Sequence, residues 1–164
     1  MREARSDEHE AVGRLAERAY RAGGHLEQDH GYDAVLLDAA SRAVPGPLLV
    51  AHVDGRLVGT ATLTPAGSRY AEIAREGETE FRFLAVEPEA AGQGVARALV
   101  DAVVDQARAA GSHTVVCCVI DWNAPGHRLY LRYGFARAPE RDWTPVPGID
   151  LLAYELALDA VTTG

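Results

Sequence analysis

The chain has 164 residues, of which 48% are apolar and 24% are charged, which is typical of one ordinary globular domain. Its formal net charge of −8 argues against a general nucleic-acid binder, whose affinity comes mostly from Lys and Arg facing phosphates. No apolar run approaches the ~18 residues that a membrane helix needs, and the start Met1-Arg2-Glu3 lacks the apolar stretch of a signal peptide. We therefore expect one cytoplasmic domain over residues 1–164, with neither membrane nor nucleic acid as a partner.

Neither the cysteines nor the histidines are spaced as metal ligands. Cys117 and Cys118 are adjacent, so on a strand their side chains point to opposite faces, and a disulfide between them would be strained. The six histidines show no ligand spacing. We expect reduced cysteines in the core and no metal site.

The N-terminal half of the chain predicts two helices followed by a β-hairpin. Asp7 is a plausible N-cap for the first helix, whose apolar residues recur at helical spacing up to Gly23-Gly24. Pro45-Gly46-Pro47 ends the second helix, and Asp54-Gly55 is a hairpin turn signal. The expected elements are a short strand at 2–5, helices at about 8–22 and 33–43, and strands at 48–53 and 56–63.

The C-terminal half predicts strands alternating with helices. A polar loop over residues 65–78 precedes a long strand that ends at Pro88, and Gly111 caps the helix that follows. The expected elements are strands at 80–86, 114–119 and 151–158, a strand beginning at 135, and helices at about 96–110 and 125–133. Together these elements predict an α/β (α+β mixed) fold, with a central mixed, mostly antiparallel sheet flanked by helices on both faces.

The segment from Phe81 to Leu99 is the most informative, because a strand leads through a glycine-bearing loop into a helix. A helix N-terminus offers unpaired N–H groups and about half a positive charge, which suits a pyrophosphate. Gly92 and Gly94 carry no Cβ, so the backbone can approach a ligand closely. The loop lacks the Gly-Lys-Ser/Thr of a P-loop. Arg97 occupies the third glycine position of a dinucleotide fingerprint, which leaves dinucleotide binding as a minor alternative.

The strand and loop read Leu84-Ala85-Val86 and then Ala91-Gly92-Gln93-Gly94-Val95-Ala96. This resembles the GNAT acetyltransferase superfamily, whose acetyl-CoA loop reads Arg/Gln-x-x-Gly-x-Gly/Ala after a strand ending in Leu-x-Val. The sequence departs from that pattern at Ala91, where the family usually has Arg or Gln. Gln93 and Arg97 are the candidates to compensate.

A second motif follows the buried strand, with Asn123, Gly126, Tyr130 and then Gly134-Phe135. It resembles the GNAT pattern Asn-x-x-Ala-x-x-x-Tyr-x-x-x-Gly-Phe, with Gly126 in place of the usual Ala. The two motifs lie in the expected order and separation, and the resemblance covers roughly residues 48–158.

The resemblance implies an N-acetyltransferase that moves an acetyl group from acetyl-CoA to a primary amine by direct attack, with no metal. In the family, backbone groups at the strand end hold the pantetheine arm and polarise the acetyl carbonyl; here these are at Leu84 and Val86. Asn123 is expected to contact the pantetheine or to cap the following helix, or both. The expected cofactor-binding residues are Leu84, Ala85, Val86, Ala91, Gly92, Gln93, Gly94, Val95, Ala96, Arg97 and Asn123.

Two residues are the expected catalytic groups. The family's motif tyrosine protonates the cofactor sulfur, and this role carries over to Tyr130. An amine with a pKa near ~10.4 is mostly protonated at neutral pH, so a general base is also needed. Glu80 is the candidate, because some family members carry a glutamate at the matching position, and Glu78 is in reserve. His127 is a weaker alternative shuttle.

Strand alternation places Glu80, Arg82, Leu84 and Val86 on one face, unless a bulge interrupts the strand. On that face Glu80 would point into the cofactor cleft.

The sequence does not identify the acceptor, which is either a small-molecule amine or a peptide amine. Trp122, Trp143, Tyr70 and Tyr32 are candidates to line its pocket. The alternative function is a catalytically inactive acyl-CoA-binding sensor or partner domain, which Ala91 favours. A homodimer is possible for such a domain.

Overall fold

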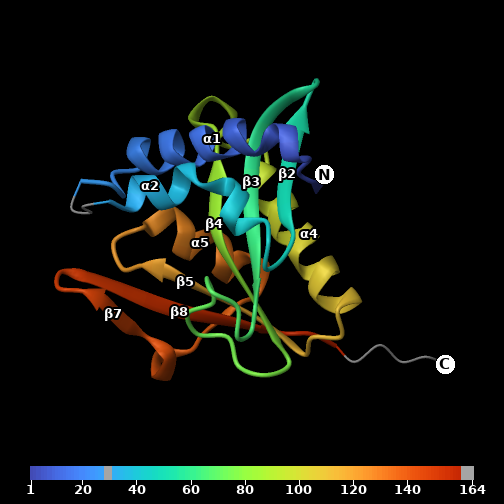
Figure 1. The fold of residues 1–164 in the computed structure, drawn as a ribbon. Coiled ribbons are helices and arrows are strands. Elements are labelled where there is room, and N and C mark those ends of the chain that lie inside the picture. The colour runs from blue at the N-terminus through green and yellow to red at the C-terminus, as the bar shows by residue number, and fades with distance from the viewer. Residues whose placement is uncertain (28–30, 160–164) are drawn as a thin grey trace.

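The computed structural model describes residues 1–27 and 31–159, which form one mixed sheet with helices on both faces (Figure 1). Within them the strand order is β1-β2-β3-β4-β5-β8-β6, and β7 pairs with β8. The β4–β5 pair is parallel and the other described pairs are antiparallel, which confirms the expected sheet. The strands are β1 (Arg2–Glu3), β2 (Leu48–Val53), β3 (Arg56–Pro65), β4 (Glu78–Val86), β5 (Thr114–Ile120), β6 (Ala136–Arg137), β7 (Trp143–Val146) and β8 (Ile149–Ala157).

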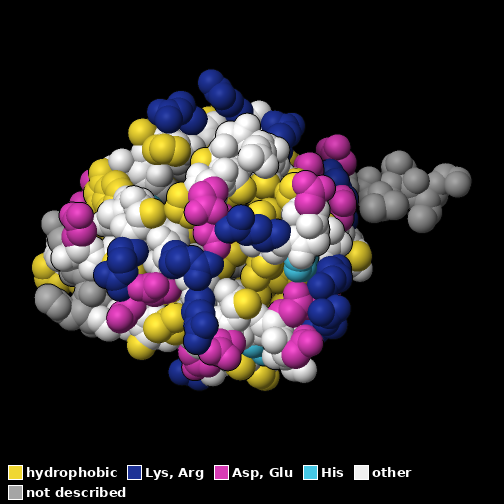
Figure 2. All heavy atoms as spheres, turned by 90° about the horizontal axis from the view of Figure 1, so that it is seen from above, with side chains coloured by type: hydrophobic (Ala, Val, Ile, Leu, Met, Phe, Trp, Pro, Cys, Tyr) yellow, Lys and Arg dark blue, Asp and Glu magenta, His cyan; other side chains and the backbone are white. Residues whose placement is uncertain are grey.

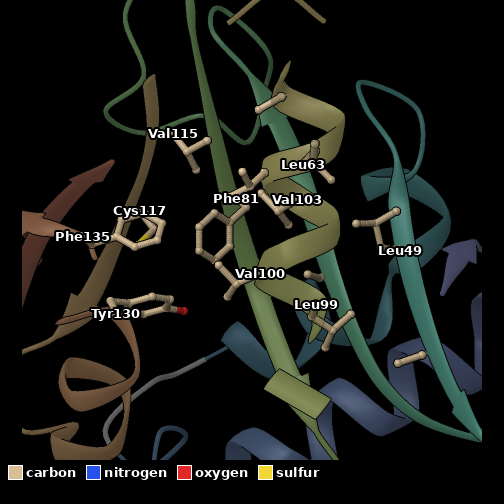
Figure 3. Close-up of a cluster of buried hydrophobic side chains, with 14 of the residues drawn as sticks. Leu49, Leu63, Phe81, Leu99, Val100, Val103, Val115, Cys117, Tyr130 and Phe135 are labelled. Carbon is tan, nitrogen blue, oxygen red and sulfur yellow. The ribbon is translucent and has the colours of Figure 1, made fainter. Parts of the chain in front are cut away.

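The helices bury apolar residues against both faces of the sheet. One face is covered by α1 (His9–Ala22), α2 (Tyr32–Leu37) and α3 (Ala39–Arg42), and the other by α4 (Val95–Ala109) and α5 (Ala124–Tyr133). Figure 3 shows the core on the α4 and α5 face of the sheet, in which α4 side chains lie over Leu49, Leu63 and Phe81. This close packing requires Gly59 on β3, because a Cβ there would lie 2.8 Å from Val95 Cγ1.

Two predictions in the N-terminal half were wrong in detail. Asp7 does not cap α1; a 3₁₀ turn over Ser6–Glu8 precedes the helix, and Glu8 Oε1 accepts the backbone N–H of Arg5 at 3.0 Å. The helix expected over 33–43 is split at Asp38, which has φ −87° and ψ 62°. The Asp38 carboxylate accepts the backbone N–H of Ser41 at 3.3 Å, so it starts a new helix rather than continuing the old one.

A bulge in β4 changes which side chains share a face. Thr60 pairs with Ala85 and Thr62 pairs with Arg82, so β4 carries one extra residue between these pairs, and Phe83 has φ 58°. Phe81, Leu84 and Val86 consequently pack on the α4 side, whereas Phe83 and Ala85 pack against α1 and α2. Simple alternation therefore fails beyond Arg82, and Glu80 does not share a face with Leu84 and Val86.

The surface is mixed in charge, and no helix in residues 1–27 and 31–159 is long and apolar enough to cross a membrane. Acidic and basic side chains are interspersed over the face seen from above α1 (Figure 2). Such a mixture on this face does not form the continuous basic surface that binds nucleic-acid phosphates.

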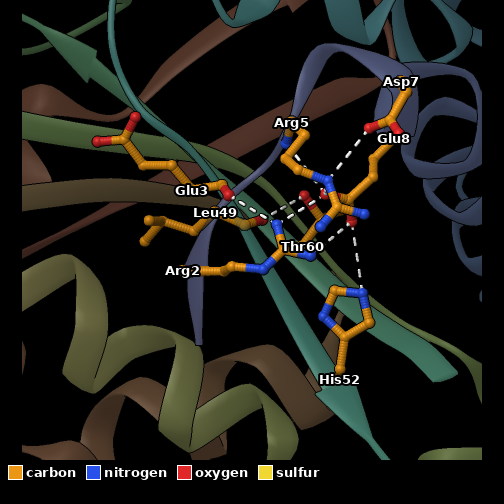
Figure 4. Close-up of polar contacts among 8 residues, drawn as sticks. All are labelled: Arg2, Glu3, Arg5, Asp7, Glu8, Leu49, His52 and Thr60. Carbon is orange, nitrogen blue, oxygen red and sulfur yellow. Dashed lines mark hydrogen bonds and ion pairs between the residues drawn. The ribbon is translucent and has the colours of Figure 1, made fainter. Parts of the chain in front are cut away.

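An ion-pair cluster ties the N-terminus to the sheet (Figure 4). Arg2 Nη1 donates to Glu8 Oε1 at 2.7 Å, and Glu8 Oε2 lies 3.4 Å from His52 Nε2 on β2. The hydrogen bond from Arg2 is the largest of the effects that lower the pKa of Glu8 to about 2. The cluster therefore stabilises the fold only while Glu8 is ionised.

We expect Glu8→Gln to lower the free energy of unfolding at pH 7 by about 1 kcal/mol, a value discounted because Arg2 is partly exposed. The folded-state pKa is depressed, so this stability is present above about pH 5 and is lost as the pH falls towards about 2. The difference between wild type and variant should shrink over that window in urea unfolding curves. Glu10→Gln, which removes a solvent-exposed pair with Arg14, is the control and should change little. A constant difference from pH 7 to pH 2 would contradict the assignment.

Candidate active site

The two central strands diverge and leave a cavity between them. The parallel pairing of β4 with β5 ends at Glu80 and Val116. Beyond that point both strands line a cavity of about 950 Å³. Its lining includes Leu84 and Val86, which pack on the α4 side, and Phe83 and Ala85, which pack on the α1 side. The walls of the cavity therefore come from both faces of the sheet, and it is large enough for a small-molecule site.

The glycine loop between β4 and α4 meets one end of this cavity. Gly92 and Gly94 both have φ 80°, a left-handed conformation that favours glycine, and a Cβ on either would meet no heavy atom within 4 Å. α4 begins directly after Gly94, and the first N–H groups of a helix lack intrahelical partners. Ala91 and Ala96 lie on the cavity wall. The loop thus fits a pyrophosphate group joined to a chain that enters the cavity.

The expected cofactor residues fall into two groups in the structure. Those that line the cavity are Leu84, Ala85, Val86, Ala91, Ala96 and Asn123. The others lie outside its lining: Gly92, Gln93 and Gly94 are exposed in the loop, Val95 is buried against Gly59, and the Arg97 guanidinium lies 5.1 Å from the centre of the Tyr133 ring. Arg97 is thereby turned towards α5.

Tyr130 lies where the sequence motif predicts, on α5 beside the gap between the strands. Its ring packs edge-on against Phe81 of β4 at a centroid distance of 5.7 Å and against Phe135 at 5.4 Å. Figure 3 shows its hydroxyl oxygen pointing from α5 towards β4, and the residue lines the cavity. Burial raises the pKa of Tyr130 well above its ordinary value, so its hydroxyl keeps its proton at neutral pH.

Asn123 has both of its expected roles available. Its Oδ1 accepts the backbone N–H of Gly126 at 3.2 Å, which caps the N-terminus of α5, and the residue also borders the cavity. A Cβ at position 126 would lie 2.7 Å from Asn123 Nδ2. Glycine in place of the usual alanine therefore leaves room for this position of the asparagine amide.

The two glutamates proposed from sequence are buried away from the cavity lining. Glu80 is 0% exposed, and its Oε1 accepts three backbone N–H groups, from residues 72, 73 and 74, at 2.8 to 3.0 Å. Glu78 forms a two-fold ion pair with Arg141 at 2.7 and 2.8 Å. Although burial opposes it, the hydrogen bonds from Arg141 and from the Arg75 N–H hold the pKa of Glu78 below its ordinary value. The Glu78 carboxylate is thus ionised and engaged in an ion pair that stabilises the fold.

A different carboxylate, which the sequence did not single out, reaches the cavity. Glu72 belongs to the loop between β3 and β4, and its Oε1 lies 3.0 Å from Arg82 Nε. Arg82 also donates to the Tyr70 carbonyl at 3.0 Å and to the Tyr32 hydroxyl at 3.3 Å. Burial raises the pKa of Glu72, although the Arg82 guanidinium acts in the opposite direction.

The end of the cavity nearest α1 and α2 has aromatic walls. Tyr20, His25, Tyr32 and Phe83 line it, and the Tyr32 and Phe83 rings stack at a centroid distance of 6.1 Å. Of the four aromatic residues proposed from sequence for an acceptor pocket, only Tyr32 lines the cavity. Tyr70 packs edge-on against Phe83, while Trp122 and Trp143 are 50% and 37% exposed, Trp122 beside His25 and Trp143 at the start of β7.

His127 Nδ1 lies 2.6 Å from the Tyr154 hydroxyl and its Nε2 lies 3.0 Å from the Asp121 carbonyl, so both ring nitrogens are engaged, and the residue does not line the cavity. Cys117 and Cys118 are free thiols. His30 lies outside the described residues, and among those described no group of His, Cys, Asp and Glu is arranged to hold a metal ion.

Comparisons with known proteins identify the family and related folds. The family model described as Acetyltransferase (GNAT) family matches residues 9–135. The fold resembles a GNAT-family protein from Desulfovibrio desulfuricans, with a TM-score of 0.74 and 22% identity over 96% of each chain. It also resembles yncA from Salmonella typhimurium, solved with acetyl-CoA, with a TM-score of 0.67 and 25% identity over 97% of this chain and 93% of that one.

A third similar structure is the ribosomal-protein-alanine N-acetyltransferase from Brucella melitensis, with a TM-score of 0.69 and 22% identity over 96% of this chain and 98% of that one. No curated protein sequence matches the chain. Six of the seven described strand pairs are antiparallel, whereas a dinucleotide-binding fold has a mostly parallel sheet, so the fold does not fit the dinucleotide-binding alternative. The family model covers most of the chain, and the chain therefore belongs to the GNAT acetyltransferase family.

Proposed function

We propose that the chain is a single-domain N-acetyltransferase, spanning residues 1–164, that transfers an acetyl group from acetyl-CoA to a primary amine by direct attack. The observation that carries this proposal is the cavity, with walls from both faces of the sheet, that lies where β4 and β5 diverge. The glycine loop and the start of α4 meet one end, and the aromatic walls form the other. Two reactants entering from opposite ends would meet between the strands.

Direct attack is favoured because the thiols at the site are poor nucleophiles. Burial raises the pKa of Cys118 to about 12, and it raises the pKa of Cys117 well above its usual value. The thiolate is the nucleophilic form of cysteine, so neither residue is set up to carry the acetyl group.

Each of several residues of the chain would carry out one part of the reaction. Acetyl-CoA, when bound, supplies an acetyl group activated as a thioester. Tyr130 holds a proton for the sulfur that departs. Backbone groups near Leu84 and Val86, which lie beyond the end of the β4–β5 pairing, would orient the pantetheine arm and polarise the carbonyl. The remaining cofactor contacts are proposed for residues 91–97 and Asn123, and the amine proton passes to a carboxylate.

Isothermal titration with acetyl-CoA, CoA and NAD, followed by a free-thiol assay with a panel of primary amines, tests the proposal. We expect micromolar binding of acetyl-CoA, no binding of NAD, and amine-dependent thiol release. Acetyl-CoA binding without turnover on any amine would instead support the inactive sensor or partner domain. No binding at all would remove the acetyltransferase proposal.

A further inference from the structure

The loop that carries Glu72 is fixed to the sheet by a buried carboxylate. The backbone N–H groups of Glu72, Ile73 and Ala74 donate to Glu80 Oε1 at 2.9, 2.8 and 3.0 Å. Glu80 is completely buried, and its second oxygen, Oε2, has no hydrogen-bond partner. Burying a carboxylate costs free energy unless hydrogen bonds compensate for the lost water. Here the compensating hydrogen bonds come from three consecutive residues, of which Glu72 is the first, and they hold this segment in place.

The side chain of Glu72 is held from the other side by Arg82. The Arg82 guanidinium also donates to the Tyr70 carbonyl and to the Tyr32 hydroxyl, so its own position is fixed. Only 17% of the Glu72 side chain and 18% of the Arg82 side chain are exposed, and both residues line the cavity. The charge of Glu72 is among the causes that raise the pKa of Cys118 on β5, which also lines the cavity.

We propose that Glu72 is the catalytic base that takes the proton of the acceptor amine, and that Glu80 is a positioning residue that holds Glu72 at the cavity. This inference rests on the proposed acetyl transfer. The base is then a residue that lines the cavity, and Glu80, which does not line it, holds the loop that carries this base.

The proton balance of the step is complete with these groups. An N–H bond of the acceptor ammonium breaks and an O–H bond forms on Glu72, which frees the nitrogen lone pair. The N–C bond to the acetyl group forms as the C–S bond breaks, and the sulfur takes the proton of Tyr130. The nitrogen then loses its second proton, which returns to the Tyr130 oxygen, and Glu72 releases the first proton to solvent. A carboxyl with a raised pKa suits a base that works near neutral pH. The ionisable groups that face Glu72 are Tyr20 of α1, Tyr32 of α2, Glu80 and Arg82 of β4, and Cys118 of β5.

The positioning role is tested without any acceptor, by NMR hydrogen exchange of the amides at residues 72, 73 and 74. In Glu80→Ala we expect these amides to exchange at least about tenfold faster, because their acceptor is gone. In Glu80→Gln the amide oxygen still accepts, so most of the protection should return. Exchange rates in Glu80→Ala equal to those of wild type would overturn the positioning role.

The catalytic role is tested by the pH profile of kcat/KM in the thiol-release assay, using the best amine of the panel. We expect Glu72→Gln to lower kcat/KM about 100-fold and to abolish the acidic limb of the profile. Glu80→Gln should keep that limb with a smaller loss, and acetyl-CoA should bind each variant as it binds wild type. Glu76→Gln, which changes an exposed glutamate of the same loop, is the matched control and should behave as wild type.

The outcomes separate this inference from the proposed function. An acidic limb that survives in Glu72→Gln and disappears in Glu80→Gln would make Glu80 the base and overturn the inference alone. Absence of thiol release from wild type with every amine would overturn the acetyl transfer and the base role together. The exchange measurement would still decide whether Glu80 holds the loop.

Discussion

Tyr130→Phe is expected to turn over at no more than about one hundredth of the wild-type rate, because the departing sulfur loses its proton donor. The aromatic contacts with Phe81 and Phe135 remain in the variant, so the fold and the cavity should stay intact. The dissociation constant of acetyl-CoA, measured by isothermal titration, should be unchanged within about twofold. The loss would then lie in kcat and not in cofactor binding.

A second tyrosine on the same helix provides the matched control. The Tyr133 hydroxyl donates to Asp101 at 2.6 Å on the far side of α5, and the residue does not line the cavity. Tyr133→Phe removes this surface hydrogen bond and should leave kcat near its wild-type value. Equal losses in the two variants would point to helix stability, and full activity of Tyr130→Phe would exclude the proton-donor role.

The positions of the glycine loop and of Tyr130 were predictable because each depends on a short stretch of sequence. Gly94 follows a strand and starts an apolar helix, and Tyr130 lies seven residues after an asparagine that caps its own helix. Glycine conformation and helix capping act over a few residues, so such patterns can be recognised without the fold. The structure places these groups near the cavity expected for them.

The acceptor end could not be predicted in the same way, because it depends on contacts that no local pattern specifies. Glu72 reaches the cavity because residues 72–74 donate to Glu80 on the central strand β4, and because Arg82 of the same strand holds its side chain. One signal was available: Glu80 lies in a strand rich in aromatic residues, and a buried carboxylate requires donors nearby. Hydrogen-bond donors near Glu80 could therefore be expected, but the sequence does not indicate that the segment that supplies them also brings Glu72 to the cavity.

Gly94→Leu is expected to weaken acetyl-CoA binding at least about 30-fold, which corresponds to about 2 kcal/mol. Gly94 has φ 80°, and its Cβ would point into open space at the start of α4. A leucine side chain there would occupy the place proposed for the pyrophosphate, and it would strain the loop whose N–H groups would bind it. Isothermal titration measures the effect directly.

A leucine at Gly94 would both strain the backbone and obstruct the ligand. A leucine at a glycine beyond the other end of α4 would strain the backbone alone, and it therefore separates the two effects. Gly111 has φ 79° and, as at Gly94, a Cβ there would meet no heavy atom within 4 Å, but it lies beyond the C-terminus of the helix. Leucine at either position should cost about 1–2 kcal/mol of stability for the left-handed backbone. Only Gly94→Leu should also lose acetyl-CoA affinity. If Gly111→Leu weakened binding equally, the loss would follow from general destabilisation, and the loop would not be the pyrophosphate site.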